Sequence, residues 1–122
     1  MALLPFNADD VFALDTKIRW VGLATRKGQL VFAQMRPGVE SITPESDDRL
    51  LLELRAQYIT EVCGQVNQWA GPTEYIAMSH EKFTELIIIL KEKYLAMTLE
   101  KSTPTEKFPA LAKKAQELWF NV

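Results

Sequence analysis

The chain has 122 residues, of which 48% are hydrophobic and 25% are charged, and its formal net charge is −2. A chain of this length and composition can bury a hydrophobic core without metal or disulfide support, which excludes an intrinsically disordered protein. The slightly negative charge excludes the basic surface that binding to a nucleic-acid backbone requires.

Cysteine content and the length of the apolar runs predict that the protein is cytoplasmic. The single cysteine, Cys63, cannot form an internal disulfide, so we expect a reducing, cytoplasmic environment. The N-terminus has neither the basic region nor the long apolar stretch of a signal peptide. The longest apolar run, Leu86 to Leu90, is far too short to span a bilayer, and we expect no membrane association.

The first third of the chain predicts a short helix followed by a β-hairpin. Asn7 is suited to capping a helix that continues to about Asp15. Strands are expected at 18–25 and 30–35, and the four residues between them form a tight turn. Gly28 supplies the positive φ that such a turn needs.

A long helix is expected next. Thr43 is a good N-cap and Pro44 suits the first helical position, so the helix begins there and runs to about Trp69, before Gly71-Pro72. Its apolar side covers nearly half of the helical wheel and consists of Leu51, Leu54, Tyr58, Ile59, Val62, Cys63, Val66 and Trp69. A helix that rests on one sheet needs an apolar stripe only a little over about 100° wide. The excess predicts a second surface on which this helix packs.

The remaining residues predict three strands and a helix. Strands are expected at 73–79, 83–90 and 94–99, and the last helix at 105–120. The run from Leu86 to Leu90 shows no alternation between apolar and polar residues. Both faces of that strand should therefore be buried.

These elements predict an α/β (α+β) fold with three layers, formed by one domain over residues 1–122. The first two strands also carry apolar residues on both faces, so the sheet needs helices on both sides. We expect a five-stranded antiparallel sheet with the long helix on one face and the two terminal helices on the other.

The element order carries a family resemblance, together with the segments Ile18-Arg19-Trp20-Val21-Gly22-Leu23-Ala24-Thr25 and Gly28-Gln29-Leu30-Val31. The layout resembles the Roadblock (dynein light chain) and profilin-like superfamily, which includes the longin domains, and the segments resemble the first hairpin of small archaeal Roadblock-like proteins. The resemblance implies a non-enzymatic interaction module. From the residues we also expect no cofactor. Roadblock-like domains commonly dimerise and serve as platforms or regulators for small GTPases and motor complexes, and profilin-like relatives bind actin-type proteins.

The wide apolar side of the long helix predicts a surface for a protein partner, either a second copy of the chain or another subunit of an assembly. The residues expected to form it are Leu51, Leu54, Arg55, Tyr58 and Val62. In related Roadblock-like domains, strands from two chains extend one sheet while the long helices pair. The competing interpretation is that the segment Leu3-Leu4-Phe6 folds over the helix within one chain.

Arg55 is the unusual member of this surface, because its wheel position lies between Tyr58 and Val66, inside the apolar arc. One interpretation is that its guanidinium reaches water at the margin of the helix. The other is a polar contact at an interface, where arginine is enriched.

No residue pattern indicates a catalytic centre or a metal site, so we expect no enzymatic activity. Cys63 and His80 are formally a nucleophile and a base, but a cysteine on an apolar helix face is better interpreted as buried and structural. One histidine cannot form a zinc site. Glu74, Glu81 and Glu85 are interpreted as a solvated sheet edge, and neither GxGxxG nor GxxxxGK[ST] is present.

A small-molecule sensor domain of the PAS type is the alternative to an interaction module. It shares the order of two strands, a helix and three strands, but it leaves a ligand cavity on the helix side of the sheet. Tyr75, Met78, Phe83 and Cys63 would line that cavity. An unrecognised enzyme is the third interpretation.

Overall fold

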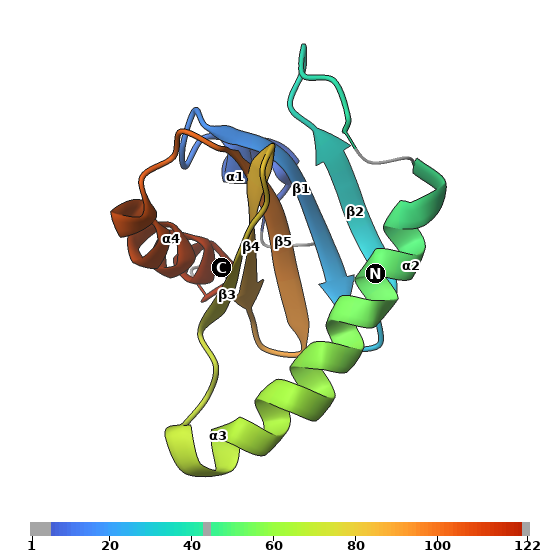
Figure 1. Cartoon of the computed structure of the whole chain (residues 1–122), viewed down its shortest axis with the longest axis vertical. Helices are drawn as coiled ribbons and strands as arrows, with labels where there is room; N and C mark the ends of the chain where they lie inside the picture. The colour runs from blue at the N-terminus through green and yellow to red at the C-terminus, as the bar shows by residue number, and fades with distance from the viewer. Residues whose placement is uncertain (1–5, 43–44, 121–122) are drawn as a thin grey trace.

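A five-stranded antiparallel sheet forms the middle layer of the computed structural model, which describes residues 6–42 and 45–120 (Figure 1). The strands are β1 (Ile18–Thr25), β2 (Leu30–Met35), β3 (Tyr75–Ser79), β4 (Phe83–Ile89) and β5 (Lys93–Glu100). They lie in the order β2-β1-β5-β4-β3. The helices are α1 (Ala8–Phe12), α2 (Glu45–Tyr58), α3 (Gly64–Ala70) and α4 (Phe108–Phe120). A π-helical turn, η1 (Ile59–Cys63), joins α2 to α3, and a 3-10 turn, η2 (Thr105–Lys107), precedes α4.

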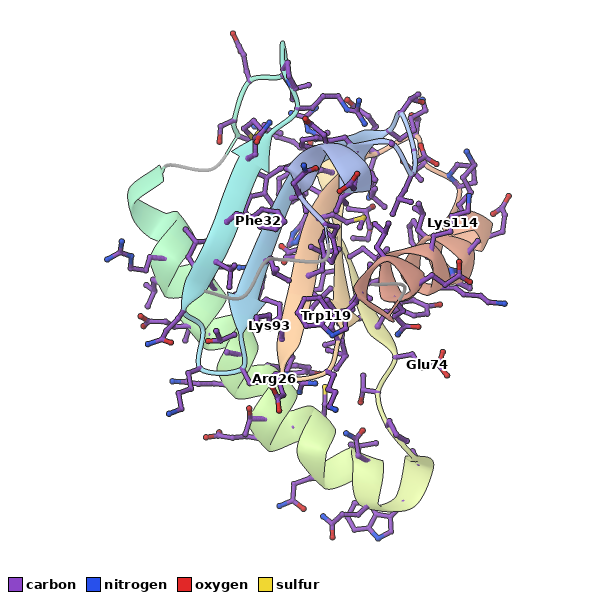
Figure 2. The ribbon with its side chains drawn as sticks, turned by 180° about the vertical axis from the view of Figure 1, so that it is seen from behind. Arg26, Phe32, Glu74, Lys93, Lys114 and Trp119 are labelled. Carbon is purple, nitrogen blue, oxygen red and sulfur yellow. The ribbon has the colours of Figure 1, made fainter. Side chains whose placement is uncertain are left out.

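Helices cover both faces of the sheet, which confirms the expected three-layer architecture. The long helix, made of α2, η1 and α3, crosses one face, and the two terminal helices α1 and α4 lie on the other (Figures 1 and 2). Among the described residues, no helix has the length and apolar character that crossing a membrane requires.

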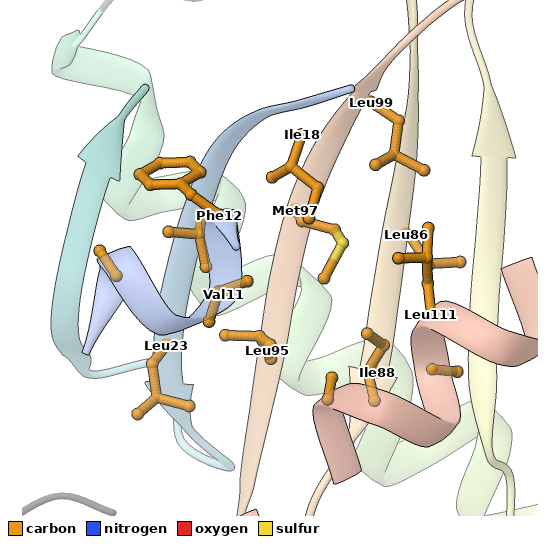
Figure 3. Close-up of a cluster of buried hydrophobic side chains, with 14 of the residues drawn as sticks. Val11, Phe12, Ile18, Leu23, Leu86, Ile88, Leu95, Met97, Leu99 and Leu111 are labelled. Atoms are coloured by element: carbon orange, nitrogen blue, oxygen red, sulfur yellow. The ribbon is translucent and has the colours of Figure 1, made fainter. Parts of the chain in front are cut away.

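The larger hydrophobic cluster lies between the sheet and the two terminal helices (Figure 3). Val11 and Phe12 from α1 and Leu111 from α4 point into it. The strands contribute Ile18, Val21, Leu23, Leu86, Ile88, Leu95, Met97 and Leu99. Alternate residues of β1, β4 and β5 therefore fix the positions of α1 and α4.

The smaller cluster lies under the long helix. Leu52, Ala56 and Ile59 of the helix are buried against strand residues that include Ala24 and Ala96. Small side chains on both elements allow the helix and the sheet to approach closely. Ile87 belongs to this cluster while its neighbours Leu86 and Ile88 belong to the other, so both faces of β4 are buried, as expected.

Several element boundaries differ from the sequence-based expectation for local reasons. Asn7 caps α1 through a capping box with Asp10, with bonds of 3.1 and 2.9 Å. The helix nevertheless ends at Phe12 rather than near Asp15, whose Oδ1 accepts the Lys17 backbone N–H at 2.8 Å in a turn. The third strand begins at Tyr75 rather than Thr73. The expected helix start at 43–44 lies outside the described residues.

Strand β2 is less buried than the sequence pattern predicts. Leu30 and Val31 are exposed, because β2 is an edge strand and a break in the register between Leu23 and Ala24 of β1 displaces its first residues. The expectation that both faces of the first two strands are covered is therefore correct for β1 and wrong for β2.

Candidate interaction surface

The outer face of the long helix carries a continuous stripe of apolar side chains. It consists of Leu50, Leu54, Tyr58, Val62, Val66 and Trp69, which are exposed to between 45% and 80% of their surface. The stripe spans 19 residue steps at about 1.5 Å each, or about 29 Å. With a helix width of about 10 Å, it forms a face of roughly 300 Å², which is in the range of the largest apolar patch on a typical soluble protein, a patch that is often functional.

The π turn keeps the two halves of this apolar stripe on one side of the helix. In a regular α-helix, residues four apart are offset by about 40° around the axis. Over the three steps from Leu54 to Val66, an unbroken α-helix would therefore rotate the stripe by about 120°. In η1 the Gly64 N–H instead bonds the Ile59 carbonyl, five residues back. A four-residue step is closer to a full turn here, and Val62 and Val66 therefore stay aligned with Tyr58.

The two edge strands of the sheet differ in their capacity to pair with another strand. Edge strand β3 (YIAMS) has no charged residue, and its register with β4 is unbroken from Tyr75 to Ser79. Edge strand β2 carries the register break described above and follows Arg26-Lys27. Bulges and lysines are common devices that prevent edge-to-edge pairing. Strand β3 is thus the edge open to a further strand.

Arg55 does not lie in the stripe, because its guanidinium turns to the sheet and is ion-paired with Glu85 of β4 in the same chain. The Glu85 side chain is 4% exposed and that of Arg55 is 20% exposed. The interpretation of Glu85 as part of a solvated edge is wrong, and so is the interpretation of Arg55 as a guanidinium directed to water. A carboxylate in this position is stable in the sheet only because a guanidinium on α2 faces it.

Tyr94 makes a second polar contact between the long helix and the sheet. Its hydroxyl donates a hydrogen bond of 2.5 Å to the carbonyl of Leu52 on α2. Burial raises the pKa of Tyr94 above its ordinary value; the nearby Arg55 lowers it and Glu85 raises it further. The phenol therefore stays protonated as a donor, and together with the Arg55–Glu85 pair it fixes the position of α2 over the sheet.

A cleft of about 240 Å³ separates the first half of α2 from the end of the sheet nearest Met35 and Phe83. Its floor is a row of paired residues across four strands, Met35, Trp20, Thr98 and Glu85. Helix α2 contributes Leu51, Leu52 and Arg55 to the lining, which also includes the polar side chains of Arg19, Ser41 and His80.

The other side chains singled out in the sequence lie off the apolar stripe, and two of them, His80 and Phe83, line the cleft. Cys63 is buried and unpaired with another cysteine, as expected. Of the four residues expected to line a sensor cavity, Phe83 lines the cleft, whereas Tyr75 and Met78 pack in the two hydrophobic clusters. His80 is exposed, with its ring 5.3 Å from that of Phe83.

The N-terminal segment does not cover the long helix at the one position that the structure describes. Phe6 is buried on the opposite face of the sheet, with its ring 6.1 Å from those of Phe32 and Trp119, which Figure 2 shows on that face. Leu3 and Leu4 lie outside the described residues. The interpretation of Phe6 as a cover for the helix is therefore wrong.

Of the five residues expected on the partner surface, Leu54, Tyr58 and Val62 lie on the exposed apolar stripe. Leu51 lines the cleft and Arg55 contacts Glu85 instead. Sequence reasoning missed Leu50 on the outer face and Leu52 and Ala56 on the inner face. The sequence does contain a pattern for the inner face, because Leu52, Ala56, Ile59 and Cys63 recur at helical spacing. The run of leucines at 50–52, however, does not show which of the three faces the sheet.

Comparisons with known proteins identify the fold. No family model matches the sequence, and no curated protein matches it. Among solved structures, the chain is similar to MglB in a tetrameric arrangement, with a TM-score of 0.72, 12% identity and coverage of 98% of this chain and 96% of that one. A Roadblock/LC7 domain from Streptomyces avermitilis gives a TM-score of 0.69 at 8% identity, covering 93% of this chain and 89% of that one.

Profilin from Schizosaccharomyces pombe is also similar, with a TM-score of 0.59, 14% identity and coverage of 93% of this chain and 90% of that one. The chain therefore has the Roadblock and profilin-like fold that its element order and first hairpin predicted. At these identities the similarity establishes the fold alone.

Proposed function

We propose that this chain is a non-enzymatic protein-interaction module that forms a homodimer and, as a dimer, serves as a platform or regulator for a protein partner. The observation that carries the proposal is the exposed stripe of six apolar side chains along α2, η1 and α3. The resemblance to Roadblock-like domains makes a small GTPase or a motor-complex subunit the class of partner to test first.

A second copy of the chain is the occupant that suits the apolar stripe best. The stripe has no charged residue along its length, and its centre falls between Tyr58 and Val62. Two stripes related by a two-fold axis through that centre would each cover the other over about 29 Å. MglB, which shares the fold, is known in a tetrameric arrangement, which supports assembly from copies of one chain.

The edge strand β3 completes the proposed interface. Specific interfaces bury about 1,200–2,000 Å² in total, more than two helix faces of roughly 300 Å² supply. Pairing of β3 with its copy would add main-chain hydrogen bonds and extend the sheet across the dimer. The register break near the start of β2 leaves that edge outside the homodimer.

Within this interface we place Leu54, Tyr58 and Val62 at the contact itself. Leu51 and Arg55 would not contact the partner, because they lie on the side of the helix that faces the sheet. Their role would be to keep the helix in position. The module needs no catalytic group for this role, and its specificity would come from the shape of the stripe and the sheet edge.

Multi-angle light scattering on the purified chain tests the proposal. The wild type should show twice the chain mass of 13.9 kDa, and the double variant Leu54→Glu/Tyr58→Glu should show a monomer, because two charges would be buried without partners. Leu30→Glu is the matched control, since Leu30 and Leu54 are 50% and 49% exposed, and it should remain dimeric. A wild type that stays monomeric at hundreds of micromolar would refute the homodimer.

A further inference from the structure

The cleft under the first half of α2 has a flat aromatic floor. A Cβ atom built on Gly22 would lie 2.4 Å from Cη2 and 2.8 Å from Cζ2 of Trp20. The indole ring therefore lies down over the backbone of Gly22, where no larger residue leaves room for it. Trp20 is partly exposed and lines the cleft, so one face of its ring is available for stacking.

Two arginines line the cleft, and they differ in where their carboxylate partners lie. Arg55 is neutralised by the buried Glu85. Arg19 is ion-paired with Glu100, which does not line the cleft. The two charged groups are 3.3 Å apart, and the Glu100 side chain is 43% exposed. A guanidinium has five N–H donors, and within the described residues Arg19 donates one hydrogen bond to Glu100 and one to the Glu40 carbonyl. Arg19 therefore retains donors for an anionic group.

The volume of the cleft limits the size of what it can hold. At about 240 Å³ it exceeds the roughly 150 Å³ cavity that accepts benzene and falls below the roughly 300 Å³ at which pockets for drug-sized ligands begin. One or two fused rings with a short substituent would fill it. Nucleotides and larger cofactors are too large.

We propose that the cleft binds a small aromatic carboxylate. The ring stacks on Trp20 beside Met35 and Leu51, and the carboxylate pairs with Arg19. This site goes beyond the interaction function and does not depend on it, because the cleft lies on the inner side of α2 and the stripe on the outer side.

Titration of the ¹⁵N-labelled full chain with 2-naphthoate, followed by heteronuclear NMR, tests the site. We expect saturable shifts at the Trp20 indole N–H and at the amides of Leu51 and Phe83, with a Kd of about 1 mM or tighter for a probe of this size. The uncharged analogue 2-naphthamide should bind at least tenfold more weakly. Equal affinity for the amide, or shifts confined to the outer stripe, would overturn the proposal.

Variants of the cleft separate specific binding from a change in the fold. Arg19→Gln should raise the Kd at least tenfold, whereas Lys27→Gln, which removes a cation at the opposite end of β1, should leave it unchanged. Thr98→Met, which fills the cleft from its floor without removing a charge, should abolish the shifts. The monomeric variant Leu54→Glu/Tyr58→Glu should bind 2-naphthoate as the wild type does, so failure of the dimer and failure of the cleft are distinguishable. Unchanged affinity in both Arg19→Gln and Thr98→Met would refute the site.

Discussion

Replacing Arg55 with methionine removes one charge from a pair that the fold has taken out of water. Methionine keeps most of the side-chain volume, so the main loss is the guanidinium that faces Glu85. Glu85 lies on β4, next to the central strand β5, and is only 3% exposed, and its carboxylate would be left without a partner. Breaking a buried ion pair in this way costs about 3–5 kcal/mol, a large part of the roughly 5–15 kcal/mol that stabilises a domain.

Replacing Glu85 instead of Arg55 should cost less stability, because the partner that remains is more exposed. In Glu85→Leu the remaining Arg55 is already 20% exposed, and its long side chain can turn the guanidinium toward the cleft and water. We expect a loss of about 1–2 kcal/mol. In the double variant Arg55→Met/Glu85→Leu no charge is left, and stability should return to within about 1 kcal/mol of the wild type.

Urea unfolding of the four proteins, followed by circular dichroism at one protein concentration, measures this cycle. The concentration must be held fixed because dimerisation contributes to apparent stability. The expected coupling between the two sites is at least about 3 kcal/mol, with the double variant more stable than Arg55→Met alone. Losses that simply add, or an Arg55→Met variant that loses less than about 1 kcal/mol, would show that the pair does not hold α2 on the sheet.

Three further predictions concern other contacts of the long helix. Gly28→Ala would place a Cβ only 2.5 Å from the α2 backbone at a positive φ. Urea titrations should show a loss of about 3 kcal/mol or more in its free energy of unfolding. The control Gly38→Ala has a similar φ in open space and should lose only about 1 kcal/mol. Because burial raises the pKa of Tyr94, the wild type should lose stability as the pH rises above about 10. Tyr94→Phe should lack that loss; an identical pH dependence would contradict the assignment. Buried Cys63 should react with a thiol reagent slowly in native protein and stoichiometrically in denaturant, and fast native reaction would argue against burial.

Much of the fold could be predicted from the sequence because its signals are local. The tight turn at Gly28, the break at Gly71-Pro72 and the unbroken apolar run at 86–90 each depend on a few adjacent residues. Together they predicted five strands, the long helix and a sheet covered on both faces. Boundaries were missed where a side chain caps a turn, as Asp15 does beyond α1.

The interaction surface could be predicted only in part. A helical wheel shows that apolar residues cover too much of the circumference, but it does not show which of them face the sheet. The structure turns Leu52 and Ala56 inward and Leu50 and Leu54 outward, because small residues under the helix allow the close approach. The π turn, which aligns the C-terminal half of the stripe, has no signature in the sequence that we could read.

The sequence by itself determined the amphipathic periodicity, the turns and the layer order, since these follow from contacts between residues a few positions apart. Only the tertiary structure decided the rest. Arg55 and Glu85 are 30 residues apart and meet because α2 crosses β4 at that point. The cleft over Trp20 is lined by residues of α2 and of four strands, which only the tertiary structure brings together. The position of the helix depends on side-chain sizes on both elements at once, and that information is not local to either one.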